Sequence, residues 1–244
     1  MHHKPKILSL MFCLAVLAPC KRVFAEDSVL PVLHVRFDSE QQSALTDDPE
    51  VNVPVTCHAP DGPAADFLRE GIISKALYVS RTNPAQARIG LTDVRDLSQP
   101  MTMMAWIKPT RNRRHIIIDA MSERDGQYAG YRLYLDYFYR LRVQVGIGNR
   151  LETIITDKYS TETNYWAHVA AVLETDKLTL YVNAAKVAQK HITPSLPTIT
   201  KPPVLHVGTH GYRHSFPFQG LIDDVKIFDM AMTENDIVQA AREW

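Results

Sequence analysis

The fold class is decided by four stretches: YWAHVAAVL (165–173), LTLYVNAAKVA (178–188), LHVGT (205–209) and FQGLIDDVKIFDMAMT (218–233). Each stretch is a short, mostly apolar run with alternating polar positions, and residues that favour turns follow it. Such runs at short intervals are typical of sequential antiparallel strands. The last third of the chain therefore predicts an antiparallel β-structure.

The same pattern extends towards the N-terminus. Residues 32–37, 101–109 and 116–120 each form an apolar run of strand length. Residues 130–146 (GYRLYLDYFYRLRVQVG) predict a hairpin that bends near residues 136–139. Many short strands without alternating helices leave a sandwich, a jelly roll or a barrel. We therefore expect an all-β fold.

One short helix is expected close to the C-terminus. Thr233 is an N-cap candidate, and Asp236 stands three residues later, close to the pattern of a capping box. Ile237, Val238 and Ala241 give the segment an apolar stripe at helical spacing.

Residues 1–25 have the features of a secretory signal peptide. Two lysines supply a positive start, residues 7–17 form an apolar core too short to cross a bilayer, and Val23-Phe24-Ala25 matches a cleavage pattern. Cleavage after Ala25 predicts a secreted or periplasmic protein with one domain over residues 26–244. The sequence contains no Asn-x-Ser/Thr sequon, which favours a bacterial source.

The cysteines allow one alternative to simple secretion. Cys20 follows Leu17-Ala18-Pro19 at the position of a lipidated cysteine, but Pro19 stands where a small residue is needed. Cleavage after Ala25 removes Cys13 and Cys20 and leaves Cys57 alone, so no intramolecular disulfide can form. A lone cysteine of this kind is expected to behave as a small buried hydrophobic residue.

Charge disfavours some classes of partner. Removal of the signal takes away four of the 27 basic residues and none of the 27 acidic ones, so the remaining domain is slightly acidic. A slightly acidic domain does not favour a nucleic acid partner. No later apolar run is long enough to span a membrane as a helix.

Six stretches resemble, in order, the strand motifs of laminin-G-like domains in the concanavalin A-like lectin/glucanase superfamily. They are VLHVRFDSE (32–40), GIISKALYV (71–79), MTMMAWIKP (101–109), YWAHVAAV (165–172), LTLYVN (178–183) and FQGLIDDVKIFDMAMT (218–233). The resemblance implies a β-sandwich of two facing antiparallel sheets with jelly-roll topology. One hairpin departs from the family's usual Asn-Gly because it has Asn183-Ala184, so a longer turn or another turn type is expected there.

The resemblance also implies one structural calcium ion between the first strand and the Ile-Asp-Asp-Val strand. The matching positions are Asp38, Asp223 and Asp224, and carboxylate oxygens are ligands that calcium prefers. The alternative is that these are solvated acids at strand ends, which cap turns.

The predicted hairpin offers a candidate ligand site. One face carries Arg132, Tyr134, Arg142 and Gln144, and the alternate positions are leucine and valine. Glycan sites combine aromatic rings with planar hydrogen-bonding side chains. This face is therefore a candidate glycan-binding surface, and the alternative is an ordinary polar outer face.

A late loop and two tryptophans are further candidates. The loop THGYRHSF (209–216) contains Tyr212 and Arg213, and loops at the ends of sandwiches often bind ligands. Trp166, in an apolar run, is expected in the core. Trp106 shares its strand face with polar residues and fits either a stacking platform or the core.

The sequence lacks the usual catalytic pattern of the superfamily's glucanase branch, Glu-x-Asp-x-x-Glu. Glu174-Thr175-Asp176 begins in that way, but Thr179 occupies the position of the second glutamate. We therefore expect a non-catalytic module that binds a glycan. A protein-interaction or adhesion domain for a cell-surface protein is the alternative, and a glycan-degrading hydrolase or lyase comes third.

Overall fold

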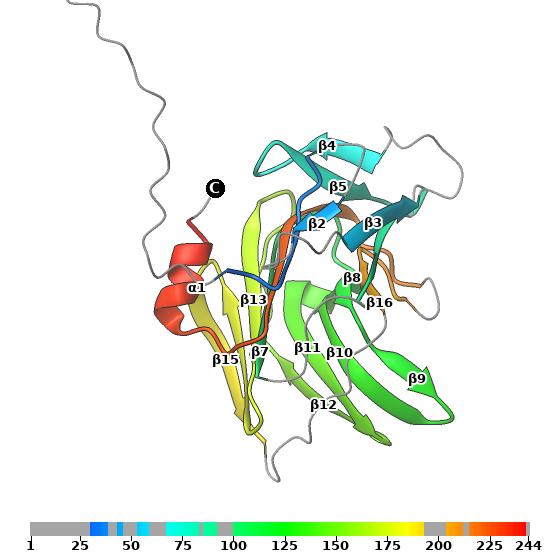
Figure 1. Cartoon of the computed structure of the whole chain (residues 1–244). Helices are drawn as coiled ribbons and strands as arrows, with labels where there is room; N and C mark the ends of the chain where they lie inside the picture. The colour runs from blue at the N-terminus through cyan, green and yellow to red at the C-terminus, as the bar shows by residue number, and fades with distance from the viewer. Residues whose placement is uncertain are drawn as a thin grey trace, which may run out of the picture.

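The protein is a two-layer β-sandwich with one short helix, as the computed structural model shows (Figure 1). The structure describes residues 30–38, 43–45, 53–58, 67–82, 85–91, 100–192, 204–211 and 215–242. The predicted signal peptide, Cys20, Tyr212 and Arg213 lie outside the described residues.

The first sheet is built on the long strands of the family-like motifs. In spatial order, β15, β14, β13, β7 and β17 pair side by side, and β17 then pairs with both β1 and β5. β4 pairs with β5, and β2 pairs with β1. The strands are β1 (Leu33–Val35), β2 (Ser43–Leu45), β4 (Leu68–Glu70), β5 (Lys75–Val79), β7 (Met101–Pro109), β13 (Ala167–Leu173), β14 (Lys177–Val182), β15 (Ala185–His191) and β17 (Gly220–Phe228).

The second sheet contains the predicted hairpin. Its spatial order is β12, β11, β10, β8, β16, β6 and β3, and β9 also pairs with β10. All of these pairs are antiparallel, and β3 also pairs with β2 at the corner where the two sheets meet. The strands are β3 (Val53–His58), β6 (Gln86–Gly90), β8 (His115–Asp119), β9 (Ser122–Arg124), β10 (Gln127–Asp136), β11 (Arg140–Gly148), β12 (Arg150–Ile155) and β16 (Val204–Val207).

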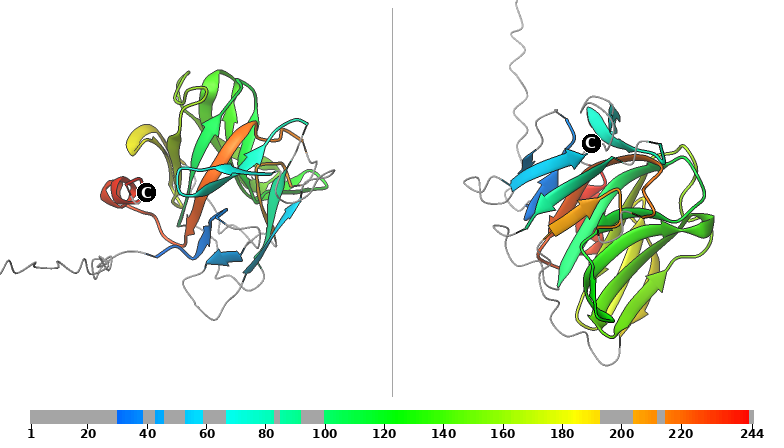
Figure 2. Two further views of the ribbon diagram at one scale, coloured as in Figure 1. Left: turned by 90° about the horizontal axis from the view of Figure 1, so that it is seen from above. Right: turned by 90° about the vertical axis from the view of Figure 1, so that its right-hand side faces the viewer.

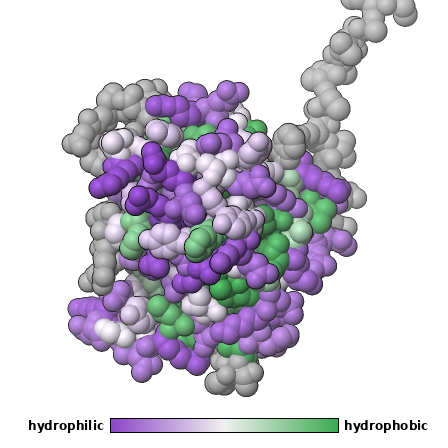
Figure 3. Space-filling model, turned by 180° about the vertical axis from the view of Figure 1, so that it is seen from behind, coloured by the Kyte–Doolittle hydropathy of each residue, from purple (hydrophilic) through white to green (hydrophobic). Residues whose placement is uncertain are grey.

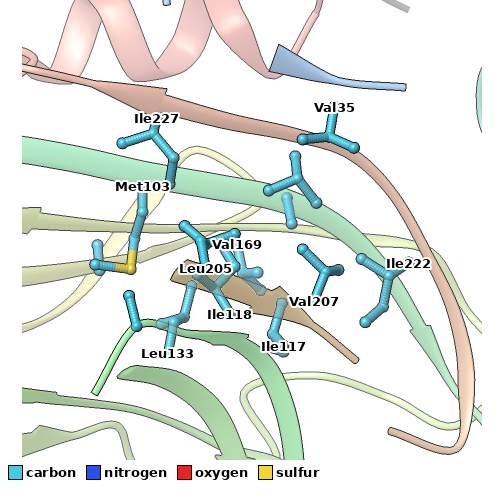
Figure 4. Packing of buried hydrophobic residues seen from close by; sticks show 14 of the residues in the cluster. Val35, Met103, Ile117, Ile118, Leu133, Val169, Leu205, Val207, Ile222 and Ile227 are labelled. Atoms are coloured by element: carbon cyan, nitrogen blue, oxygen red, sulfur yellow. The ribbon is translucent and has the colours of Figure 1, made fainter. Parts of the chain in front are cut away.

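Apolar side chains from both sheets fill the space between them. This core includes Met103, Val169 and Ile227 from the first sheet and Ile118, Leu133 and Leu205 from the second (Figure 4). Successive strand residues point to opposite faces, so the alternating pattern of the sequence puts leucine and valine inside and polar residues outside. The predicted all-β sandwich is confirmed.

The predicted C-terminal helix is α1 (Glu234–Ala240). Thr233 Oγ1 accepts the N–H of Asp236, and the Asp236 carboxylate accepts the N–H of Thr233, so the capping box is complete. Ile237 and Ala240 are buried against the outer face of the first sheet, whereas Val238 and Ala241 are only partly buried. The helix therefore covers one side of the sandwich (Figure 2).

The Asn183-Ala184 turn is shorter than expected. Val182 pairs with Ala185, which leaves a two-residue loop, and Asn183 and Ala184 have φ values of 48° and 65°. The expectation of a longer or different turn is wrong, because the pairing of β14 with β15 holds alanine in the left-handed region despite its steric cost.

The two tryptophans differ from expectation. Trp166 lies just before β13 and is only partly buried, because the strand begins at Ala167. Trp106 is 8% exposed, and its ring meets the His168 ring edge-on at 5.4 Å. The assignment of Trp166 to the core is therefore wrong, and Trp106 is buried beside His168.

The surface is largely polar. Seen from behind, hydrophilic side chains cover most of the molecule and apolar groups form separate patches (Figure 3). Within the described residues, no helix has the length and apolar character needed to cross a membrane.

Candidate functional site: the outer face of the β10–β11 hairpin

The hairpin β10–β11 sets the register of the candidate site. Arg132 pairs with Gln144, and Tyr134 pairs with Arg142, so all four predicted side chains lie on the outer face of the second sheet. The intervening Leu133 is fully buried in the core. The structure thus brings four of the six predicted ligand-binding residues together.

A hollow of about 200 Å³ lies over this face. Its lining includes the aromatic side chains of Tyr128, Tyr134 and Phe216 and the planar polar groups of Arg114, Glu123, Arg132, Gln144 and His210. Phe216 is 44% exposed, so part of its ring is available for stacking. A concave site of aromatic rings and hydrogen-bonding groups has the chemistry to bind a polar, ring-shaped ligand such as a sugar.

Arg132 is held rigidly at the floor of the hollow. Its Nε donates to Asp119 Oδ1 at 2.9 Å, and one terminal nitrogen donates to His210 Nε2 at 2.8 Å. Asp119 is 1% exposed and also accepts the backbone N–H groups of Met121 and Gly211. The buried carboxylate, itself held by two backbone donors, therefore fixes the position of the guanidinium.

Tyr134 is a neutral phenol within this site. Burial raises the pKa of Tyr134, and the neighbouring Arg142 and Arg114 oppose that rise. Arg142 donates to the Tyr134 hydroxyl at 3.1 Å, so the hydroxyl oxygen acts as an acceptor there. The guanidinium groups of Arg142 and Arg114 lie 5.6 and 6.0 Å from the ring centre.

Asp136 lies at the end of β10 among three arginines. Its carboxylate lies 2.8 Å from Arg142, 3.5 Å from Arg140 and 3.8 Å from Arg114. Asp136 is 3% exposed and also accepts the N–H of Tyr137, which starts the bend of the hairpin. The buried carboxylate therefore fixes both the turn and the arginines around it.

The tip of the hairpin presents exposed aromatic rings. Tyr137, Phe138 and Tyr159 are 53%, 41% and 64% exposed. Phe138 and Tyr159 have left-handed backbone conformations, with φ of 63° and 60°, and their rings meet edge-on at 6.3 Å. Bulky residues avoid this conformation, and such outliers concentrate at functional sites.

The three carboxylates predicted to bind calcium have other partners. Asp223 accepts the N–H groups of Ile72, Ile73 and Asp224. Asp224 contacts His34 and also lies 3.1 Å from Lys226 Nζ. Among the residues that the structure describes, no three acidic, histidine or cysteine side chains are grouped to hold a metal ion.

Asp38 is engaged separately, because its Oδ1 accepts the N–H of Lys75 at 3.4 Å. Burial raises the pKa of Asp223 to about 7, against the effect of its three N–H donors. Calcium binding by Asp38, Asp223 and Asp224 stays a prediction of the family resemblance.

The six residues predicted to bind the ligand leave out several residues of the hollow. These residues include Arg114, His210 and Phe216, which lie in loops next to β8 and β16. Because β8 pairs with both β10 and β16, these loops lie at the edge of the hairpin face. A run of three arginines at residues 111–114 was the available signal for Arg114. The candidate loop 209–216 contains His210 and Phe216, but only contacts between distant strands show that these two residues face the hairpin.

The comparisons with known proteins agree with this architecture. A sequence profile of the concanavalin A-like lectin/glucanases superfamily, of laminin G type, matches residues 83–238. The chain belongs to this superfamily. A search of curated protein sequences gave no significant match.

Solved structures with the same superfamily fold include toxin binding domains. The binding domain of Paraclostridial Mosquitocidal Protein 1 is 17% identical with a TM-score of 0.66, and the match covers 87% of this chain and 52% of that one. The ligand-binding domain of Botulinum neurotoxin serotype D, in complex with N-acetylneuraminic acid, is 16% identical with a TM-score of 0.63, covering 87% and 50%. This superfamily member thus spans about half the length of these structures, and at such identities the likeness shows the fold alone.

Proposed function

We propose that this protein is a non-catalytic carbohydrate-binding module and that the hollow over the β10–β11 hairpin holds the sugar. The observation that carries the proposal is the composition of the hollow. Tyr128, Tyr134 and Phe216 provide rings, and Arg132 and Gln144 provide planar donors and acceptors in one concave site. A pyranose can stack its C–H face on such rings while its hydroxyl groups bond to the planar side chains.

The similar structures support a binding role. They are toxin binding domains, and one of them is a complex with N-acetylneuraminic acid, a sugar. The predicted signal peptide fits a role outside the cytoplasm, either secreted or periplasmic.

A glycosidase role is less well supported by the site. A hydrolase of this kind needs two carboxyl groups on either side of the scissile bond. Glu123 is the acidic residue among the described residues that line the hollow, and Asp119 beneath it is fixed by Arg132 and backbone donors. The site also fits a sugar better than a protein partner. It is concave and polar, whereas sites for protein partners are typically flat apolar patches.

A glycan array with the purified chain tests the proposal, and it should carry both neutral and acidic glycans. We expect binding to one sugar class and a loss of at least about tenfold in affinity for Gln144→Ala and Phe216→Ala. Gln189→Ala, at an exposed position of β15 on the other sheet, is the matched control and should bind normally. If no glycan binds, or if both site variants bind like the wild type, the proposal is wrong.

A further inference from the structure

The end of the hollow at Arg114 has an excess of positive charge. Arg114, Arg140 and Arg142 surround one buried carboxylate, that of Asp136. One carboxylate can neutralise one guanidinium group, so two positive charges in this cluster lack a counter-charge within it. Arg142 is the close partner at 2.8 Å, whereas Arg140 and Arg114 lie further away at 3.5 and 3.8 Å.

These two outer arginines retain donors for another acceptor. The Nε atom of Arg114 is buried and lies 3.8 Å from Asp136 Oδ1, beyond hydrogen-bond distance, so the carboxylate does not engage Arg114 closely. Arg140 uses its Nε on the carbonyl of Tyr137 and makes only a long contact with Asp136. The two side chains are 38% and 28% exposed, so a ligand can reach them from solvent.

The hollow has opposite charges at its two ends. Glu123 pairs with Tyr128 near the start of β10, whereas the Arg114 guanidinium lies over the ring of Tyr134, six residues further along the strand. Asp119, between these ends, is already bound to Arg132 at 2.9 Å. An acidic ligand group would therefore be attracted to the arginine end.

Aromatic rings and one lysine border the arginine end. The Lys158 Nζ atom lies 4.8 Å from the centre of the Phe138 ring, and the Arg140 guanidinium lies 5.9 Å from the same centre. On the other side, the Arg114 guanidinium lies 5.1 Å from the Phe216 ring. A ligand that extends past the hollow would thus meet rings next to positive charges.

We propose that the cluster of Arg114, Arg140 and Arg142 is a subsite for the negatively charged group, carboxylate or sulfate, of an acidic glycan. The uncharged part of the glycan lies in the hollow, towards Tyr128 and Gln144. Guanidinium groups suit this role because their planar donors match the oxygen atoms of carboxylates and sulfates. This inference rests on the proposed carbohydrate-binding function and adds the class of sugar and its orientation.

Isothermal titration calorimetry with matched oligosaccharides tests the subsite. The probes are a chondroitin hexasaccharide without sulfate, its sulfated form, and its carboxyl-reduced form, which is neutral. We expect at least one acidic probe to bind about tenfold or more tightly than the neutral one. Raising the salt from about 50 to about 300 mM should weaken the acidic interaction and leave the neutral one unchanged.

The double variant Arg114→Gln/Arg140→Gln removes the two outer charges and leaves the close Arg142–Asp136 pair in place. It should lose most of the preference for the acidic probe and keep its affinity for the neutral glycans that bind the wild type. Arg36→Gln is the matched control, at an exposed position after β1 in the other sheet, and should bind like the wild type. Thermal unfolding of each variant confirms that it is folded.

The outcomes separate this inference from the proposed function. If acidic and neutral probes bind equally, or if the double variant keeps the acidic preference, the subsite is wrong and the carbohydrate module stands. If neither these probes nor any glycan on the array binds, the subsite and the proposed function both fail.

Discussion

His168 shows how burial changes the chemistry of a single residue. It is 2% exposed on the first sheet, its ring meets Trp106, and its Nδ1 atom has no hydrogen-bond partner among the described residues. Burial, with a smaller effect of Lys226, lowers the pKa of His168 to about 4. The imidazole is therefore neutral in the folded protein at neutral pH, and it acts as a packing group.

This pKa predicts a pH dependence of stability. The unfolded chain protonates His168 near pH 6.5, above the folded pKa of about 4, so its contribution is complete above pH 6.5 and is lost as the pH falls towards 4. The shift in the pKa of His168 corresponds to about 3 kcal/mol in the free energy of unfolding. Urea unfolding of the wild type and of His168→Gln at several pH values measures the contribution of His168 to stability. The difference between the two proteins isolates this contribution, because other titrating groups such as Asp223 are common to both. Parallel stability curves for the two proteins between pH 7 and 4 would contradict this assignment.

Cys57 is a second residue that burial makes inert. It is half-buried at the edge of the core, and burial raises the pKa of its thiol to about 12. The thiol therefore stays protonated at neutral pH, as expected for a small hydrophobic residue.

At the scale of elements, the turn of the hairpin β14–β15 has a steric cost that a single substitution can relieve. Ala184 has a φ of 65°, a conformation that costs an alanine about 1 kcal/mol and a glycine almost nothing. We expect Ala184→Gly to raise the free energy of unfolding by about 0.5 to 1 kcal/mol. Chemical denaturation measures the change.

Ala185→Gly is the matched control for this turn, because Ala185 is exposed and is the first residue of β15. Its replacement should lower stability by about 0.5 to 1 kcal/mol, since glycine gains freedom in the unfolded chain. Destabilisation by both changes would show that the turn does not strain Ala184.

The helix α1 depends on its cap as well as on its packing. Thr233 and Asp236 exchange two hydrogen bonds that satisfy donors at the start of the helix. Thr233→Ala should destabilise the protein by about 1 kcal/mol, and Thr233→Ser, which keeps the hydroxyl group, should retain most of the stability. Equal stability of the alanine variant and the wild type would mean that burial of Ile237 and Ala240 alone holds α1.

At the scale of the whole molecule, the last long strand closes the first sheet, because β17 pairs with β7, β1 and β5. The family resemblance predicts that calcium on Asp38, Asp223 and Asp224 stabilises this closure. The alternative is that the N–H groups and cationic side chains that contact these carboxylates stabilise it without calcium. Thermal unfolding in calcium and in chelator decides between them. A higher Tm in calcium, abolished by Asp38→Asn, supports the ion, and an unchanged Tm supports the contacts described above.

The sequence predicted the parts of the fold that depend on local pattern. Strongly alternating or apolar runs gave β7, β10, β11, β13 and β17, and the capping box gave α1. It did not predict β9 or β12, whose residues are mostly exposed or partly exposed and carry little hydrophobic pattern. For the candidate site, alternation correctly put Arg132, Tyr134, Arg142 and Gln144 on one face.

The amino-acid sequence by itself determined the all-β class, the superfamily and the inward and outward faces of the main hairpin, because these follow from the two-residue period of a strand. Only the tertiary structure decided that Arg114, His210 and Phe216 join that face as a hollow. It also decided that three arginines share the Asp136 carboxylate. These features depend on the register between strands that are distant in the chain, which the packing of the whole core fixes.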